Sequence, residues 1–497
     1  MKAKKNCAII STRKAAQGSD AVVMRKSTGE RREKKNIQAQ RFEEYERSIL
    51  RALNKRRMTS TKWLALGYVL IIAIGTGLLM LPAACRPGEI TSFKGALFTA
   101  TSAACVTGLS LYDTYTHWSA FGQVILLVLI QIGGIGFITL AISAISLTKK
   151  KIGMRERFLI QESVAAPQVG GVVKMAKFIV VAALTVELCG AVLLSFVFVP
   201  QMGWMGVWFA VFHSVSAFCN AGFDLMGYFE PGSSLATFAG SWYVNAVIML
   251  LIIMGGIGFF VWIDAIKNRL RIRRYSLQSK MVLTMSGALI LLGAAAIFAI
   301  EYGGSAFAGK SFGEKALLSL FQSVSPRTAG FASMELIRLS PASRFVMIVL
   351  MAIGGSTGST AGGIKTNTIM VLLLSIFAQY RKKRDIELFG RRVDSDTLRQ
   401  ASCVLMLFLT TSFLCTVVIS AIEPFALDVI LFEVVSALGT VGLTLGVTAQ
   451  LSTVSHVILI MLMFVGRVGS ITVLLAFSSG SLSGMQSKYP LEKVNVG

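Results

Sequence analysis

The stretch Met351-Ala-Ile-Gly-Gly-Ser-Thr-Gly-Ser-Thr-Ala-Gly-Gly-Ile-Lys365 interrupts an apolar, helix-forming run that extends from about Phe345 to Tyr380. Its five glycines, two serines and two threonines disfavour a continuous helix. Lipid offers no hydrogen-bond partners, so unwound backbone at membrane depth survives only inside protein or along a water-filled cavity. A broken apolar segment of this kind therefore indicates a transport path.

The composition of the whole chain predicts the class of protein that surrounds this stretch. The chain has 497 residues, of which 54% are hydrophobic and 15% charged, and its mean hydropathy is +0.67. These values are too apolar for a soluble globular protein. We therefore expect an all-α integral membrane protein with several spans.

The apolar segments along the chain have two lengths, long and short. Eight of them can each cross a hydrocarbon core of about 30 Å, and they cover residues 63–82, 119–147, 175–199, 240–266, 279–301, 342–380, 401–422 and 452–480. Four shorter semi-apolar stretches suit re-entrant half-helices: 92–104, 205–219, 313–325 and 427–438. The order long, short, long occurs four times.

Basic residues set the expected orientation. Segments 149–177, 267–280 and 381–399 hold 20 Lys and Arg, whereas the segments expected on the opposite side hold 7. The positive-inside rule places these basic loops, and both chain termini, in the cytoplasm of a multi-pass cell-membrane protein. Residues 1–62 hold 18 Lys and Arg against 6 Asp and Glu. We interpret this segment as a basic tail on anionic membrane lipids, and we expect no nucleic-acid partner.

These patterns divide the chain into six parts. A basic N-terminal tail covers 1–62, and a C-terminal tail covers 481–497. Between them lie four helix–half-helix–helix repeats, the third of which has the broken second helix: 63–148, 175–266, 279–380 and 401–480.

Two glycine landmarks recur in these repeats. The first stands at the end of each short segment: Cys105-Val-Thr-Gly-Leu109, Cys219-Asn-Ala-Gly-Phe223, Arg327-Thr-Ala-Gly-Phe331 and Gly439-Thr-Val-Gly-Leu443. The second follows in the next long segment: Gly133-Gly-Ile-Gly136, Gly255-Gly-Ile-Gly258, Gly354-Gly-Ser-Thr-Gly358 and Gly466-Arg-Val-Gly469. Glycine reaches positive φ, so a loop built on it can turn its carbonyls toward a common axis. Rings of carbonyls replace the water shell of an alkali cation. Four such loops around one axis therefore predict one pseudo-symmetric pore, although small residues also serve close helix packing. Packing is the interpretation we prefer at Gly133–Gly136 and Gly255–Gly258.

The four loops together resemble the Trk/Ktr/HKT superfamily of potassium transporters, and most closely the membrane subunit of the bacterial Ktr system. The resemblance rests on Val106-Thr-Gly-Leu109, Asn220-Ala-Gly-Phe-Asp224, Ser325-Pro-Arg-Thr-Ala-Gly-Phe331 and the glycine-rich break, and it covers about residues 63–480. It implies four M1–P–M2 repeats, with eight transmembrane helices and four pore half-helices, around one central pore. It also implies a filter that binds K⁺ by backbone carbonyls of Cys105, Val106, Thr107, Gly108, Cys219, Asn220, Ala221, Gly222, Arg327, Thr328, Ala329, Gly330, Gly439, Thr440, Val441 and Gly442. Relatives with serine in the first loop pass Na⁺ more readily, so glycine at all four positions implies a preference for K⁺.

The resemblance implies that the broken helix is an intramembrane gate, whereas a permanently kinked structural helix is the alternative. The gate residues would be Gly354, Gly355, Ser356, Thr357, Gly358, Ser359, Thr360, Ala361, Gly362, Gly363 and Arg467. Arg467 follows Gly442 by 25 residues, which places it near the level of the break. It would act as a barrier to cations, bond loop carbonyls, or do both. Lys365 either snorkels to the membrane surface or is an electrostatic partner of the gate.

Four further charged residues stand beside the loops. We expect Arg327 behind the filter, bonding backbone or an acid, because it would repel K⁺ inside the pore. Asp113, Asp224 and Glu433 are candidates for attracting cations at the outer mouth, or are solvated surface carboxylates. Within the third long segment, we expect Glu187 to bond a neighbouring helix.

Other functional classes fit the sequence less well. A secondary transporter with inverted repeats also uses broken helices, but it does not predict four units that enter from one side. An enzyme would need a convergent catalytic set, and HExxH does not occur in the chain. We therefore expect no enzyme activity, no metal site other than the K⁺ path, and no organic cofactor. The resemblance further implies a homodimer, a cytosolic nucleotide-binding regulatory ring of the RCK type, and Na⁺ as an activating or co-transported ion, as in a symporter.

Overall fold

The computed structural model describes residues 60–137, 139–140, 161, 171–269, 271–383 and 385–469. The predicted N-terminal tail up to residue 59, most of the first basic loop, and everything from residue 470 onward lie outside these described residues. Helices dominate the described part, in which the strands are one short hairpin of β1 (Glu387–Leu388) and β2 (Arg391–Arg392). This agrees with the all-α class expected from composition.

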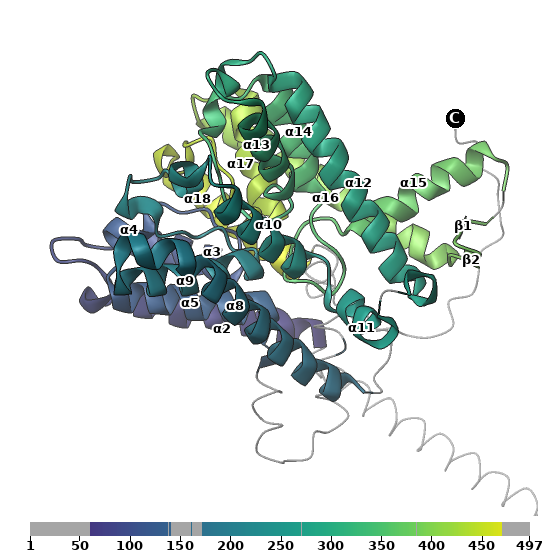
Figure 1. Ribbon diagram of the computed structural model, residues 1–497, viewed down its shortest axis with the longest axis horizontal. Helices are drawn as coiled ribbons and strands as arrows, with labels where there is room; N and C mark the ends of the chain where they lie inside the picture. Colours follow the sequence, from purple (N-terminus) through teal and green to yellow (C-terminus); the bar gives the residue numbers. More distant parts are fainter. Residues whose placement is uncertain are drawn as a thin grey trace, which may run out of the picture. The chain divides into compact units, whose positions relative to one another are not determined.

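A long helix, a shorter helix and a second helix of 12 to 16 residues follow one another four times along the chain (Figure 1). The first helices are α2 (Ser60–Leu79), α8 (Val172–Met202), α12 (Leu277–Glu301) and α16 (Ser395–Ile422). The short helices are α3 (Phe93–Ala104), α9 (Trp204–Cys219), α13 (Phe312–Val324) and α17 (Leu427–Gly439). The second helices are α5 (Ala120–Ile135), α10 (Trp242–Gly256), α14 (Pro341–Ala352) and α18 (Thr453–Val468). Three more helices are α4 (Thr114–His117), α11 (Phe259–Asn268) and α15 (Thr366–Tyr380).

Short 3₁₀ turns occupy the connections between these helices. They are η1 (Pro82–Ala84), η2 (Met226–Tyr228), η3 (Ser234–Phe238), η4 (Ile272–Arg274), η5 (Ser305–Phe307), η6 (Leu336–Arg338) and η7 (Thr448–Gln450). Serine side chains start several of the neighbouring helices. The Ser92 hydroxyl accepts from the Gly95 N–H at the start of α3, and Ser311 forms a reciprocal capping box with Glu314 at the start of α13.

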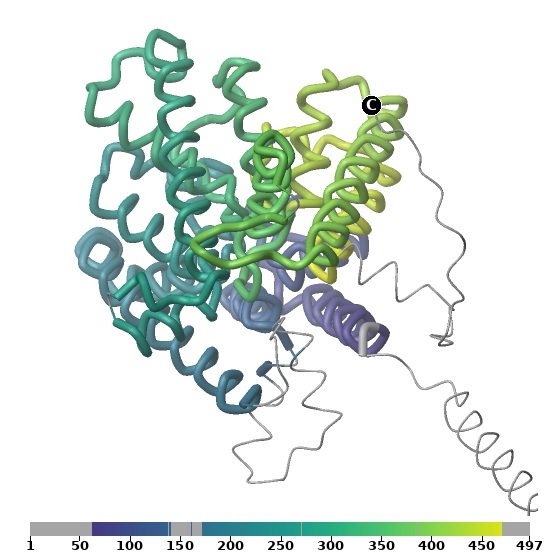
Figure 2. Tube along the Cα trace, turned by 90° about the vertical axis from the view of Figure 1, so that its right-hand side faces the viewer, coloured from purple at the N-terminus to yellow at the C-terminus, as the bar shows by residue number. Residues whose placement is uncertain are grey.

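Packing between the four groups is cyclic. Each first helix packs against its own short helix, and each second helix packs against the short helix of the next group. The second kind of contact pairs α5 with α9, α10 with α13, α14 with α17 and α18 with α3. The last pair joins the end of the helical region to its beginning, so the succession of contacts closes into a circle (Figure 2).

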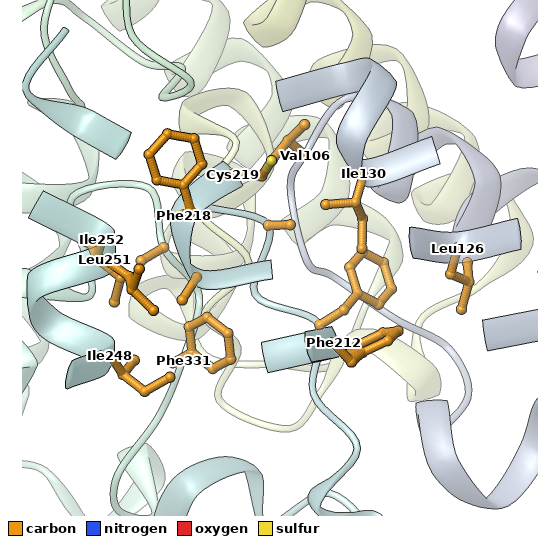
Figure 3. Packing of buried hydrophobic residues seen from close by; sticks show 14 of the residues in the cluster. Val106, Leu126, Ile130, Phe212, Phe218, Cys219, Ile248, Leu251, Ile252 and Phe331 are labelled. Atoms are coloured by element: carbon orange, nitrogen blue, oxygen red, sulfur yellow. The ribbon is translucent and has the colours of Figure 1, made fainter. Parts of the chain in front are cut away.

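The long helices have the apolar exterior that lipid requires. Phe196, Leu291 and Phe413 expose 68%, 69% and 68% of their surface, at positions where water would make exposure costly. Inside, aromatic and branched side chains pack closely around the end of α9. Figure 3 shows Phe218 and Cys219 of this region between Ile252 and Val106. The protein therefore buries one side of its helices and presents apolar side chains on the other.

Among the described residues, four helices can cross a membrane by length and composition: α2 from Lys62, α8, α12 and α16. The pair α10 and α11 would be a fifth span, although the two helices meet at a bend of 95°. The apolar segment over 240–266 is thus divided into two helices at this bend. Gly258 takes φ 95° at the bend, and Gly136 and Gly469 end α5 and α18 with φ 88° and 98°. Glycine adopts these left-handed values readily, and they terminate a right-handed helix.

Candidate cation pathway

The glycines that end the four short segments lie together and form a closed ring, here called the glycine ring: Gly108, Gly222, Gly330 and Gly442. The space of a Cβ on Gly108 lies 2.6 Å from the Ala221 carbonyl oxygen. The same space on Gly222 lies 2.9 Å from the Gly330 Cα, and on Gly330 it lies 2.5 Å from the Val441 carbonyl oxygen. A Cβ on Gly442 would overlap the Thr107 carbonyl oxygen, which closes the circle. Only glycine fits these positions, because backbone atoms cannot move away from a side chain.

The backbone before each ring glycine alternates in handedness. All four ring glycines have positive φ, and so do the residues two positions earlier: Val106 (57°), Asn220 (59°), Thr328 (68°) and Thr440 (51°). Positive φ is tolerated by asparagine, but for the β-branched valine and threonines it is a genuine outlier. Strained backbone of this kind persists where the surrounding structure enforces it, and it clusters at functional sites. Alternating handedness also lets successive carbonyls point to one side, as an ion-binding loop requires.

Buried serines hold these loops, and the sequence reasoning missed them. Ser102 and Ser436 each accept from the ring-glycine N–H six residues later, at 3.0 and 3.1 Å. Ser216 donates to the Phe223 carbonyl at 2.6 Å, and Ser325 donates to the equivalent carbonyl of Phe331. The signal is a Ser-Ala pair six residues before Gly108, Gly222 and Gly442; in the third loop, Ser325-Pro begins five residues before Gly330.

The second glycine landmark packs directly against the first. In three groups, a Cβ on the second-helix glycine would overlap the carbonyl oxygen four residues before the ring glycine. The pairs are Gly133 with Ala104, Gly255 with Phe218, and Gly466 with Leu438. This agrees with the close packing predicted at Gly133 and Gly255, and it explains why both landmarks occur in one order.

The third group differs, because α14 ends at Ala352 and α15 starts at Thr366. The intervening glycine-rich break is held by backbone bonds to the α10–α11 junction. The Ser356 N–H donates to the Gly256 carbonyl at 2.9 Å, and the Phe259 N–H donates to the Gly358 carbonyl at 2.8 Å. A Cβ on Gly362 would overlap the Thr440 hydroxyl, so the break also contacts the fourth loop, two residues before its ring glycine.

Two cations bind carbonyls of this break. Arg467 donates to the Thr360 carbonyl of the break and to the Gly133 and Gly134 carbonyls at the end of α5, the last at 3.1 Å. The Lys365 Nζ donates to the Ala361 carbonyl at 2.6 Å and to the Gly362 carbonyl at 3.4 Å. Arg467 therefore joins three groups of the chain, whereas Lys365 contacts its own segment and does not snorkel.

On the other side of the ring lies a hollow of about 500 Å³, here called the vestibule. All four ring glycines line it, together with residues that follow them in each loop. Residues that precede the glycines contact the break instead, so the ring lies between the vestibule and the break.

Two of the three candidate mouth acids line this vestibule. Asp113 caps α4 and accepts from the Gly232 N–H at 3.1 Å. Asp224 accepts from the Met226 N–H at 2.9 Å, and its burial raises the pKa of the carboxyl to about 6. Glu433 is 2% exposed and accepts from Thr444, from the Thr448 hydroxyl at 3.0 Å and from the Leu445 N–H. Glu433 thus secures the fourth loop instead of facing the vestibule.

Two buried charges lie behind the loops. Glu187 accepts from the Gln131 amide of α5 at 3.0 Å and from the Cys219 thiol of α9, so it bonds neighbouring helices as predicted. Arg327 lies behind the third loop and is 6% exposed. Its guanidinium donates to the Ser286 hydroxyl at 2.9 Å, where we had expected backbone or an acid.

Comparison with known proteins agrees with this arrangement. A family model described as TrkH, cation transport protein, matches residues 69–489. The chain belongs to this family of cation transport proteins. It is 39% identical to the potassium/sodium uptake protein NtpJ of Enterococcus hirae, over 90% of this chain and 100% of that protein. It is also 39% identical to the Ktr system potassium uptake protein B of Bacillus subtilis, over 89% and 97% of the two chains. Membership confirms that the chain is a multi-pass transporter rather than an enzyme.

A solved structure shares the fold. The crystal structure of the potassium transporter TrkH from Vibrio parahaemolyticus superposes with a TM-score of 0.69 and covers 86% of each chain, at 18% sequence identity. At this identity the likeness concerns the fold, which is that of an all-α membrane transporter.

Proposed function

We propose that this protein takes up potassium ions across the cell membrane through a pore whose narrowest part is the glycine ring. The carrying observation is the closed contact of Gly108, Gly222, Gly330 and Gly442, each with positive φ. Carbonyls of the four loops would replace the hydration shell of K⁺. The relatives named as potassium uptake proteins support the choice of ion.

In this proposal the four helix groups are M1–P–M2 repeats around one pore. The short helices are re-entrant, and both chain termini are cytoplasmic, so the vestibule faces outward. The filter is the set of loop residues 105–108, 219–222, 327–330 and 439–442. The cyclic packing of the four helix groups, in which α18 contacts α3, supports one pore within one chain.

The glycine-rich break, residues 354–363, would be the gate. It lies on the side of the ring opposite the vestibule and is tethered by Arg467. Moving it would break the Arg467 bond to Thr360, whereas the bonds to the Gly133 and Gly134 carbonyls of α5 would keep the cation beside the path. Arg467 would thus hold the gate closed and repel ions when the gate is shut.

We further propose that the protein works as a homodimer with a cytosolic nucleotide-binding ring of the RCK type, and that Na⁺ activates or accompanies transport. The name of the Ktr system relative supports a further subunit, and that of the potassium/sodium relative supports a role for Na⁺. Copurification of such a ring, with and without ATP or ADP, tests the partner. Rb⁺ uptake with and without Na⁺ tests the second ion.

The central test is growth and uptake in a host that lacks its own potassium uptake systems. We expect expression of this chain to restore growth at low K⁺ and to carry Rb⁺, with K⁺ competing far better than Na⁺. Failure to restore growth, despite protein of normal amount in the membrane, would overturn the proposed function.

A further inference from the structure

One of the four ring loops carries a charge that the other three lack. The residues three positions before the ring glycines are Cys105, Cys219, Arg327 and Gly439. Three of them are neutral, so a single fixed cation breaks the approximate fourfold symmetry of the loops. Because Arg327 immediately precedes the left-handed Thr328 (φ 68°), this charge belongs to the loop that would bind the ion.

Arg327 is buried without a compensating acid. It is 6% exposed, and none of the ion pairs among the described residues includes it. Its guanidinium donates to the Ser286 hydroxyl of α12, whereas its Nε–H has no protein partner in the described part of the chain. A small cavity of about 10 Å³ adjoins it, lined by Ser286, Val324 and apolar residues of α10.

Burying this charge without an acid destabilises the protein, which indicates that the charge has a function. Burying an unpaired charge costs several kcal/mol, and ionisable groups at membrane depth mark functional positions. A neutral polar residue could donate the same single hydrogen bond to Ser286. The cost is therefore unexplained by the contact that Arg327 makes.

We propose that Arg327 sets the cation affinity of the glycine ring, as a positioning charge behind the third loop that weakens K⁺ binding and so speeds release. This rests on the proposed function. An unscreened positive charge about 10 Å from a bound cation, at an effective dielectric constant of about 20, changes affinity by roughly tenfold. Conduction requires binding strong enough to admit the ion and weak enough to release it. The charge would thus trade affinity for rate.

Two pairs of variants test the role of the charge, one pair at Arg327 and one at Ser286. Arg327→Gln removes it, and Arg327→Lys keeps it. Ser286→Asp supplies a counter-charge at the position whose hydroxyl lies 2.9 Å from the guanidinium, while Arg327 stays in place, and Ser286→Asn is its uncharged match. Rb⁺ uptake at steady membrane levels gives KM and maximal rate, and Rb⁺-dependent thermal stabilisation of the purified full chain gives affinity independently of transport.

We expect Arg327→Gln and Ser286→Asp to lower KM about tenfold and to lower the maximal rate, while Ser286→Asn stays within about twofold of wild type. Arg327→Lys, which keeps the charge, should shift KM less than Arg327→Gln does. If Arg327→Gln does not fold, the two Ser286 variants decide alone. Equal KM in Ser286→Asp and Ser286→Asn would overturn the role of Arg327. Absence of any K⁺ or Rb⁺ transport by the wild type would instead overturn the proposed function.

Discussion

The third helix group and the other three solve the same packing problem in different ways. In the first, second and fourth groups, a second-helix glycine packs against a carbonyl oxygen of its own group, that of Ala104, Phe218 or Leu438. In the third group, the equivalent Gly354 receives the carbonyl of Gly362, which belongs to the glycine-rich break itself. The break thus occupies a position that a pore loop fills elsewhere.

This difference would let the proposed gate move while the ring stays fixed. A helix-end carbonyl such as that of Leu438 is held by a helix and cannot move without unfolding it. The Gly362 carbonyl lies in a segment that is not helical and is held by backbone bonds, by serine and threonine hydroxyls and by two cations. Proteins draw their moving elements from such weakly held segments.

The ring is the part that all groups share, so breaking it gives the largest expected effect. Gly442→Ala would place a Cβ into the Thr107 carbonyl at φ 93°. We expect at least a hundredfold loss of Rb⁺ uptake, because overpacking against backbone costs about 1–3 kcal/mol and positive φ adds strain. The comparison predicts the same loss for Gly330→Ala.

Gly446→Ala is the matched control for this variant. Gly446 also has positive φ, 88°, but a Cβ there meets nothing within 4 Å. Its backbone strain is therefore similar, while its position is outside the ring. Equal losses in Gly442→Ala and Gly446→Ala, measured at equal membrane levels, would contradict the importance of ring contact.

The sequence predicted which glycines matter but not how they meet. Spacing identified Gly108, Gly222, Gly330 and Gly442 as one set, and the structure brings them together. It could not reveal the left-handed backbone at Val106, because valine by itself strongly disfavours positive φ and only the surrounding fold imposes it. Helix ends at Gly136 and Gly258 were missed for a related reason. A glycine in an apolar run is consistent either with close helix packing or with a helix end. In this chain neighbouring glycines have both roles, because Gly133 packs closely and Gly136 ends the helix.

Substitution of the second-helix glycines tests the difference between the groups through protein stability. Gly466→Ala would force a methyl group against the Leu438 carbonyl, and we expect it to lower the free energy of unfolding by about 1–3 kcal/mol. Gly354→Ala would press on the Gly362 carbonyl of the proposed gate and should change flux more than melting temperature.

Gly287→Ala, in α12, provides the reference, because nothing lies within 4 Å of a Cβ there. In that open helical position alanine should stabilise by up to about 1 kcal/mol. Melting of the purified protein in detergent checks all three variants. A stabilised Gly466→Ala would contradict the packing described for the fourth group.

Arg467 should control how tightly the break is held. Arg467→Gln removes charge-assisted bonds to the Thr360 and Gly134 carbonyls, and we expect Rb⁺ flux to rise about three- to tenfold. Lys365→Gln should have a smaller effect, because Lys365 binds carbonyls of its own segment at 2.6 and 3.4 Å. Unchanged flux in Arg467→Gln would contradict the barrier role and leave only a structural one.

The smallest effect concerns the acidic side of the vestibule, where the second group supplies Asp224. Burial raises the pKa of this carboxyl to about 6, with the nearby Asp113 charge acting in the same direction. Asp224 is therefore ionised above pH 6 and loses its charge as the external pH falls below that value. Because a carboxylate beside the ring attracts cations, we expect the KM for Rb⁺ to rise about twofold between pH 7.5 and pH 5. Asp224→Asn should raise KM at pH 7.5 and flatten this dependence, whereas Glu230→Gln, at an exposed position of the same vestibule, should keep it. A pH profile of Asp224→Asn that matches the wild type would assign the titration to another group and leave Asp224 with its bond to Met226.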